Sequence, residues 1–275
     1  MPRYVIFLTL FAALLHAAWN TLLRGGTDRL WSMTVMCLTI AVTCTAIALS
    51  LPAPARASWP YALLSALLHV GYNLCLVRSY QVGDLGQTYP IARGSSPLLV
   101  TCAAALFAGE KIDVNTVGGI AMVSGGILML AVKEGKLATP GLRYALATGA
   151  FIAAYSVVDG MGVRIAGNAI AYIVWMSALW GALMPGLYVA LRDSGTLLRW
   201  RPGMVHAAVG GLISLLAYGL VIYAMTAAPM GAVSALRETS VLFASVLGYL
   251  FLGEALTRRR ILACALIAGG TLIIG

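Results

Sequence analysis

Charged side chains are scarce in this sequence. Asp, Glu, Lys and Arg together make up 10% of its 275 residues, whereas they make up about a quarter of a typical soluble domain. Hydrophobic residues reach 61%, and the mean hydropathy is +0.91. This composition excludes an ordinary soluble enzyme, an intrinsically disordered chain and a disulfide-rich scaffold. It predicts a membrane protein with no room for a separate soluble domain.

Sequence motifs of enzymes and ATP-driven pumps are also missing. No phosphate-binding GxxxxGK[ST] loop, HExxH pair or GxSxG elbow occurs, and Cys and His never gather at metal-ligand spacing. We therefore expect no enzymatic activity, no cofactor and no metal site. The five cysteines are odd in number and lie in apolar stretches, so they are predicted to be packing residues. They are Cys37, Cys44, Cys75, Cys102 and Cys264.

Long apolar runs occupy most of the chain, and at about 20 residues per crossing there is room for about ten membrane helices. We predict an all-α integral membrane protein, because open strand edges leave backbone groups unpaired in lipid. Polar His16 and Asn20 interrupt the first run, which favours a retained helix over a signal peptide. The predicted spans are 4–23, 31–51, 60–78, 85–108, 114–132, 142–163, 168–191, 204–226, 230–252 and 259–275.

The net charge of +9 comes from Lys and Arg residues that lie mostly between the apolar runs. Loops after odd-numbered spans carry 12 of these residues and the opposite side carries 4, while Arg93 and Arg237 lie inside spans. Because positive loops favour the cytoplasm, this count places both termini outside it. Such a distribution serves membrane topology and does not indicate nucleic-acid binding.

The second half of the chain repeats the first at an offset of 144 residues. The aligned residues include Arg93 with Arg237, Ser96 with Ser240, and Gly109-Glu110 with Gly253-Glu254. We therefore predict two repeats, 1–135 and 136–275, with five spans each. An odd number of crossings turns the second copy upside down in the membrane. Inverted repeats are typical of secondary transporters, whose substrate site lies near the midplane where the halves meet.

Each repeat ends in a Gly-Glu loop and a glycine-rich last span. The stretches are LFAGEKIDVNTVGGIAMVSGGILML and LFLGEALTRRRILACALIAGGTLIIG. In these features the chain resembles the EamA type of the drug/metabolite transporter superfamily. The resemblance implies metabolite export through a central cavity lined mainly by helices 1, 3, 4, 6, 8 and 9. Characterised bacterial ten-helix members export amino acids, including aromatic ones. The resemblance also implies cytoplasmic termini, against the charge count, so the orientation stays open.

Three charged residues lie deep within predicted spans, where a charge costs about 2.5–3.5 kcal/mol and usually faces a cavity or a partner. Arg93 or Arg237 could bind a substrate carboxylate bidentately, or each could pair with an acid or reach the membrane interface. Glu238 is the residue after Arg237, so about 100° of rotation around the helix axis separates their side chains. The two side chains should therefore face in different directions. Glu238 could bind a substrate ammonium, carry a proton or pair with Arg93.

Two polar clusters share the spacing i, i+3 and i+4, which places each on one helix face. They are His16, Trp19 and Asn20 in the first span, and His69, Tyr72 and Asn73 in the third. A polar face on an apolar helix points inward, so both clusters are candidate cavity walls, with interhelical hydrogen bonding as the alternative. Tyr218 in the eighth span is a further candidate, because that span mirrors the third.

Other polar and small residues are predicted to serve structure. Asp159 should lie near the membrane interface or pair with neighbouring Arg164, with pairing favoured. Glu110 and Glu254 should be solvated loop acids. Aromatic residues of the seventh span should in part form the interfacial aromatic belt; they include Tyr172, Trp175, Trp180 and Tyr188. Small residues should allow close packing of the fifth and tenth spans, namely Ala121 with Gly125 and Ala265 with Gly269.

These observations favour a secondary transporter that exports small metabolites, above all amino acids, from the cell across the inner membrane. A sugar phosphate or a lipophilic cation is the alternative substrate, and a membrane scaffold without transport is the alternative function. The expected partners are a small-molecule substrate and the lipid bilayer, and a monomer is compatible with this scheme. The candidate substrate contacts are His16, Trp19, His69, Tyr72, Asn73, Arg93, Tyr218, Arg237 and Glu238.

Overall fold

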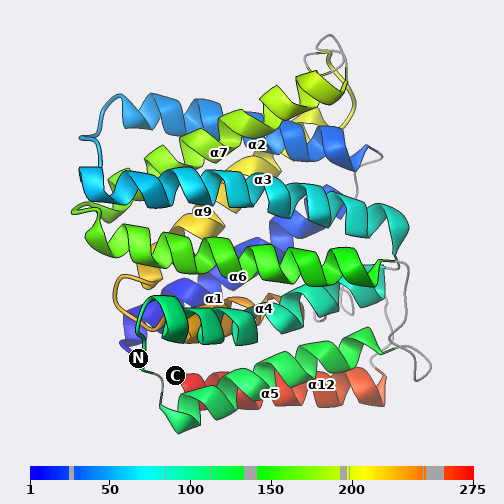
Figure 1. Ribbon diagram of the computed structural model, residues 1–275. Helices are drawn as coiled ribbons and strands as arrows, with labels where there is room; N and C mark the ends of the chain where they lie inside the picture. The colour runs from blue at the N-terminus through cyan, green and yellow to red at the C-terminus, as the bar shows by residue number, and fades with distance from the viewer. Residues whose placement is uncertain are drawn as a thin grey trace.

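A computed structural model describes residues 1–24, 28–83, 85–111, 113–132, 141–192, 197, 199–243, 245 and 257–275. Every regular element in these ranges is a helix, and the helices run along one another in a bundle (Figure 1). The α-helices are α1 Arg3–Arg24, α2 Arg29–Ala48, α3 Trp59–Val82, α4 Leu85–Phe107, α5 Val114–Ala131, α6 Leu142–Ile165, α7 Ala169–Leu191, α9 Met204–Ala224, α10 Met230–Arg237 and α12 Arg258–Ile274, with a short 3₁₀ turn at Arg56–Ser58. In the described ranges eight of them are long and apolar enough to cross a membrane.

Polar caps begin several of these helices next to the short loops. Asp28 accepts a hydrogen bond from the Trp31 backbone N–H, Asn168 caps α7 and Thr257 caps α12 in the same way. A side-chain oxygen at this position satisfies an N–H that has no partner inside the helix. At Asp113, hydrogen bonds from the Thr116 hydroxyl and from two backbone N–H groups lower the pKa of the carboxyl below its usual range.

Contacts between the two halves of the chain occur in pairs that are equivalent when the repeats are exchanged. α3 packs on α6 as α1 packs on α9, α4 packs on α6 as α1 packs on α10, and α3 packs on α7 as α2 packs on α9. Exchanging the first five spans for the last five converts each contact into its mate. α1 begins at the end of the bundle that holds the N-terminus, and α6 begins at the opposite end (Figure 1). The predicted all-α fold of two inverted five-helix repeats is confirmed.

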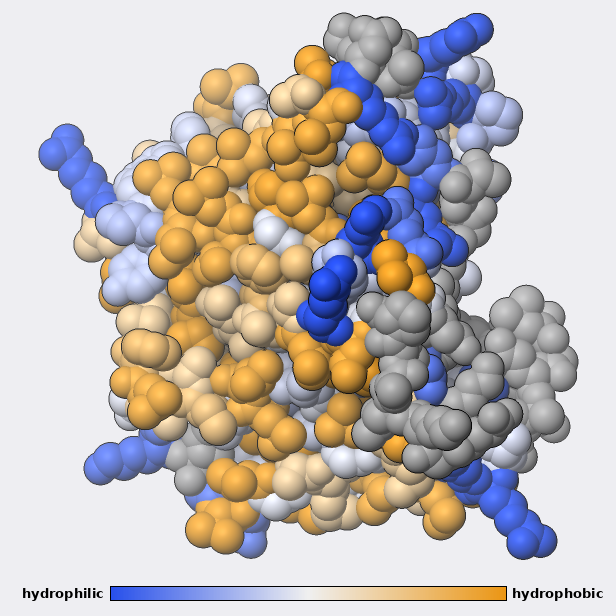
Figure 2. Space-filling model, turned by 45° about the vertical axis from the view of Figure 1, so that its right-hand side comes forward, coloured by the Kyte–Doolittle hydropathy of each residue, from blue (hydrophilic) through white to orange (hydrophobic). Residues whose placement is uncertain are grey.

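The face of the bundle that Figure 2 shows is apolar over the sides of the helices and hydrophilic toward their ends. Leu106, Phe107, Val114 and Leu272 are among the most exposed large apolar side chains. A soluble monomer rarely exposes so much contiguous apolar surface. The sides of the bundle are therefore the lipid-facing surface.

Glycines bring α5 and α12 into close contact. A Cβ atom at Gly126 would lie 2.9 Å from the Ala263 carbonyl oxygen, and one at Gly270 would lie 2.6 Å from the Gly119 carbonyl oxygen. The predicted close packing of these two helices is thus present. Its register is shifted by one residue from the prediction, because Gly125 has open space where its side chain would be.

The predicted ninth span is interrupted. α10 ends at Arg237, residues 238–239 form a turn, and helix resumes at 240–243. The Thr239 N–H bonds the Leu236 carbonyl at 3.2 Å and the Val241 N–H bonds the Glu238 carbonyl at 3.1 Å, which is the tighter pattern of a 3₁₀ turn. The expectation of one continuous helix was therefore wrong at this point. Most of 244–252, and Glu254, lie outside the described residues.

Candidate functional site

A small cavity of about 40 Å³ lies at the centre of the bundle, enclosed by seven helices. Its lining residues are His16, Trp19, Met33, Met36, Cys37, Ile40, His69, Tyr72, Asn73, Arg93, Tyr155, Trp180, Ser214 and Tyr218. Seven of the nine candidate substrate contacts therefore meet at one place. Arg237 and Glu238 are absent from this lining, and Glu238 is joined to it by its ion pair with Arg93. Relative to the lining that the resemblance implied, α2 and α7 also contribute.

Arg93, Arg237 and Glu238 form one buried charged cluster. An Nη1 atom of Arg93 lies 3.2 Å from both carboxylate oxygens of Glu238, and the Nε and Nη2 atoms of Arg237 donate to Glu238 Oε1 at 3.0 and 2.8 Å. The prediction that Arg237 and Glu238 face apart was wrong. The helix ends between them, so their side chains need not follow the 100° spacing of a continuous helix. The Arg93–Glu238 pairing was among the predicted alternatives and is present.

This cluster carries an excess of positive charge. Two guanidinium groups meet one carboxylate, and the side chains of Arg93, Arg237 and Glu238 are 4%, 0% and 0% exposed. The Nη1 atom of Arg237 has no hydrogen-bond partner among the described residues. A buried charge without compensation is costly. The cluster is therefore suited to binding one more negative charge.

An aromatic box surrounds the His69 ring. The ring stacks on Tyr155 at a centroid distance of 4.0 Å and on Trp180 at 5.2 Å. Tyr72 and Tyr218 meet it edge-on, at 6.5 and 5.2 Å. Trp180 belongs to the aromatic residues of the seventh span, which were expected in part at the membrane interface, and it is buried against the cavity. Its place in the box depends on which face of α7 packs on α2 and α3, and that face is not evident from an apolar sequence.

The two cavity histidines are held in opposite tautomers. The Trp19 indole N–H donates to His16 Nδ1 at 2.9 Å, so the neutral ring carries its proton on Nε2. His69 Nδ1 lies 2.9 Å from the Ser65 carbonyl oxygen, which can only accept, so this ring carries its proton on Nδ1. His16 Nε2 is buried without a partner among the described residues. His16 Nε2 therefore offers the cavity region a hydrogen-bond donor. The unprotonated Nε2 atom of a neutral His69 is instead an acceptor.

Asp159 does not pair with Arg164. It is fully buried and accepts hydrogen bonds from the hydroxyls of Tyr172, at 3.1 Å, and Tyr218, at 2.6 Å. Asp159 and Arg164 are five residues apart on α6, so their side chains leave the helix in different directions. Tyr155, four residues before Asp159, completes the same inward face. The spacing of Tyr155 and Asp159 matches that of His16 and Asn20, which was the signal available in the sequence.

Arg164 instead connects α6 to the segment after α4 and to the segment between α9 and α10, at one end of the bundle. Its guanidinium donates to Glu110 at 2.6 Å and to the carbonyls of Met225 and Ala228 at 2.9 and 3.0 Å. Glu110 also accepts the backbone N–H of Met230 at 2.9 Å, at the start of α10. The prediction that Glu110 is a solvated loop acid was wrong, since only 9% of its side chain is exposed.

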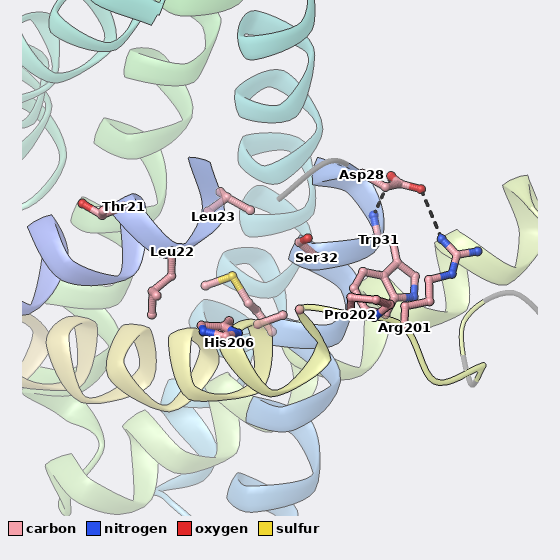
Figure 3. A pocket seen from close by; sticks show the side chains of 12 residues that line it. Thr21, Leu22, Leu23, Asp28, Trp31, Ser32, Arg201, Pro202 and His206 are labelled. Carbon is pink, nitrogen blue, oxygen red and sulfur yellow. Dashed lines mark hydrogen bonds and ion pairs between the residues drawn. The ribbon is translucent and has the colours of Figure 1, made fainter. Parts of the chain in front are cut away.

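A larger pocket of about 740 Å³ opens at the opposite end of the bundle, between α1, α2 and α9 (Figure 3). It lies at the end of the bundle with the more basic loops. Asp28 lies at the rim of this pocket, where its Oδ2 atom is 2.6 Å from Arg192 Nη1 and 3.7 Å from Arg201 Nη1. Met36 lines both this pocket and the central cavity. We call this pocket of about 740 Å³ the vestibule.

Two segments of the chain, 3–132 and 139–275, each match the model of the EamA-like transporter family. The chain belongs to the EamA-like transporter family. Members of the family are membrane transporters rather than enzymes, so this protein is a multi-pass membrane transporter of the drug/metabolite type. Among curated proteins no match was found. One solved crystal structure is similar over 98% of this chain and 94% of its own, with 18% identity and a TM-score of 0.75. That likeness concerns the fold alone.

Proposed function

We propose that this EamA-like transporter exports amino acids, including aromatic ones, by alternating access between its two inverted repeats, across the inner membrane. The observation that carries the proposal is the buried cluster of Arg93, Arg237 and Glu238 beside a cavity walled by aromatic rings. A cluster with one excess positive charge fits a ligand with a single carboxylate. An aromatic wall with a few polar groups fits an amphipathic solute.

The unmatched donors near the cavity support a carboxylate ligand. Arg237 Nη1 and His16 Nε2 are buried and have no acceptor among the described residues. A carboxylate that enters the cavity would give these donors partners and would compete with Glu238 for Arg93. Charge-assisted hydrogen bonds of this kind are shorter and about twice as strong as neutral ones. Glu238, once released by Arg93, would be available for the ammonium group of the ligand.

The size of the cavity supports the interpretation of this conformation as one step of the proposed transport cycle. A space of about 40 Å³ holds a water molecule, whereas small-molecule sites usually occupy about 300–1,000 Å³. The centre is therefore closed here, while the vestibule of about 740 Å³ has room for an amino acid. Displacement of Met36 would join the two spaces, and we propose this route for substrate entry.

The alternative substrates fit the cluster less well. A sugar phosphate carries about two negative charges, and convergent basic residues would be needed to balance them. A lipophilic cation has no carboxylate to compete with Glu238 for Arg93, so Glu238 would keep both of its guanidinium partners. The proposal of a monocarboxylate substrate follows from this charge balance.

Counterflow in proteoliposomes tests the proposal. Radiolabelled amino acids should exchange through the wild-type protein, and Arg93→Gln should slow exchange about 10-fold or more, because a hydrogen bond to a charged group is worth about 1.5–3 kcal/mol. The matched control is Arg143→Gln, since Arg143 is exposed at the start of α6. Equal exchange in Arg93→Gln and wild type would reject the carboxylate site. Exchange of sugar phosphates or quaternary ammonium compounds in place of amino acids would reject the substrate class.

A further inference from the structure

Asp159 is a buried acid that the substrate cluster does not use. It lies on α6 with no exposed surface, and its two oxygens accept hydrogen bonds from Tyr172 and Tyr218. None of the ion pairs in the described part of the chain includes it, because Arg93 and Arg237 pair with Glu238 and Arg164 pairs with Glu110. A carboxylate in such a place has a high cost of desolvation, and proton uptake removes that cost.

Asp159 is connected to the central cavity by two polar routes. Tyr218 donates to Asp159 at 2.6 Å, and its ring lies against His69 and lines the cavity. On α3, the Ser65 hydroxyl faces the Asp159 carboxyl and lies 3.2 Å from His69 Nδ1. A change in the charge of Asp159 can therefore reach the cavity through one hydroxyl group on either route.

Protonation would change what Tyr218 does. As a carboxylate, Asp159 accepts from both tyrosine hydroxyls. As a neutral acid, it carries an O–H donor of its own and offers one acceptor fewer, which allows the Tyr218 hydroxyl to turn to another acceptor. Tyr218 belongs to α9 of the second repeat and lies against His69 on α3 of the first. The hydrogen bond is thus placed where the two repeats meet.

We propose that Asp159 is the proton-binding site through which this transporter couples substrate movement to a proton gradient. One proton binds the Asp159 carboxylate to give the neutral acid and leaves again to the opposite side, with no other bond made or broken. The titratable groups around it are Tyr172 on α7, Tyr218 on α9, Tyr155 on α6 itself and His69 on α3. The charged groups toward the cavity are the mutually paired Arg93, Arg237 and Glu238 on and after α4 and α10. This inference rests on the proposed transport function and adds its driving force.

The test compares gradient-driven uptake with counterflow in proteoliposomes, using radiolabelled phenylalanine as the probe. In the wild type, an imposed pH gradient should raise phenylalanine accumulation at least 10-fold over vesicles without a gradient. Asp159→Asn should abolish this stimulation and still exchange phenylalanine by counterflow. The matched control is Asp113→Asn, because Asp113 is an exposed helix cap outside the membrane spans and Asn also caps helices.

The outcomes separate the two proposals. Counterflow without any response of the wild type to the gradient would overturn the coupling and leave the transport function standing. A full response in Asp159→Asn would overturn the role of Asp159. Absence of counterflow for every amino acid would reject the proposed function itself.

An infrared measurement tests the site without transport. Acid-minus-alkaline difference spectra of the purified protein should contain a carboxylic-acid C=O band that disappears in Asp159→Asn and shifts in Asp159→Glu. If neither variant folds, the wild-type spectrum alone decides, since Tyr172 and Tyr218 hydrogen bonds should move this band away from that of a solvated acid. A difference spectrum without such a band would overturn the proposal.

Discussion

At the scale of the residue, the buried charges of this transporter compensate one another only in part. Glu238 holds two guanidinium groups and also accepts from Ser96 Oγ at 3.4 Å. The three charged residues of this cluster come from α4, from the last residue of α10 and from the turn that follows it. The cluster therefore depends on a single acid, and the removal of that acid should matter more than the removal of either arginine.

Glu238→Gln should be strongly destabilising. The substitution leaves two buried guanidinium groups without a counterion, and breaking a buried ion pair in this way costs about 3–5 kcal/mol. Thermal unfolding of the detergent-solubilised protein measures the loss. The double variant Arg93→Gln/Glu238→Gln restores the wild-type net charge of the cluster, so it should be more stable than Glu238→Gln alone. A double variant that is less stable than the single one would contradict this account.

Residue spacing predicted which polar side chains turn inward, but not their partners. The i, i+3, i+4 spacing placed His16, Trp19, His69 and Tyr72 together, and they do line one cavity. The partner of Asp159 was predicted from its neighbour in sequence, and the actual partners come from α7 and α9. Partners across helices depend on crossing angles and rotation, which a single apolar sequence does not determine.

At the scale of the element, helix positions followed from the apolar runs and the caps, whereas the break after α10 did not. The predicted starts of α5, α6 and α9 agree with the structure. The turn at 238–239 lies in the polar stretch Arg237-Glu238-Thr239-Ser240, and the apolar residues on both sides of that stretch favoured one continuous span. Because the helix ends between Arg237 and Glu238, their side chains can approach each other and form an ion pair.

The contact of α5 with α12 offers a matched pair of substitutions. Gly126→Ala should destabilise the protein by about 1–3 kcal/mol, the usual cost of overpacking, because its Cβ would lie 2.9 Å from the Ala263 carbonyl oxygen. Gly125→Ala adds the same methyl group one residue earlier on α5, into open space. Thermal unfolding of the two variants should therefore differ, with Gly125→Ala close to wild type. Equal effects would show that α5 and α12 are not in this contact.

At the scale of the whole molecule, the two ends of the bundle differ. At one end Arg164 and Glu110 join the end of α4 to the segment before α10, and at the other end the vestibule reaches inward to Met36. The inverted repeats predicted that two such states exist, since exchanging the conformations of the halves would exchange open and closed ends. Which end is open could not be predicted, because both repeats have nearly the same apolar pattern.

Met36 lines both the vestibule and the cavity, so we expect it to form the barrier between them, and Cys37 beside it can report on that barrier. Met36→Ala should join the two spaces and raise the rate at which a membrane-impermeant thiol reagent modifies Cys37 several-fold, because Cys37 lines the cavity and is buried in this state. Cys44, two turns further along α2, is also buried but lies off the cavity lining, so its modification should not change. Mass spectrometry of the labelled protein distinguishes the two cysteines. Met36→Trp should have the opposite effect on Cys37 and should slow amino-acid counterflow. If Cys37 reacts equally in both variants, substrate does not reach the centre past Met36.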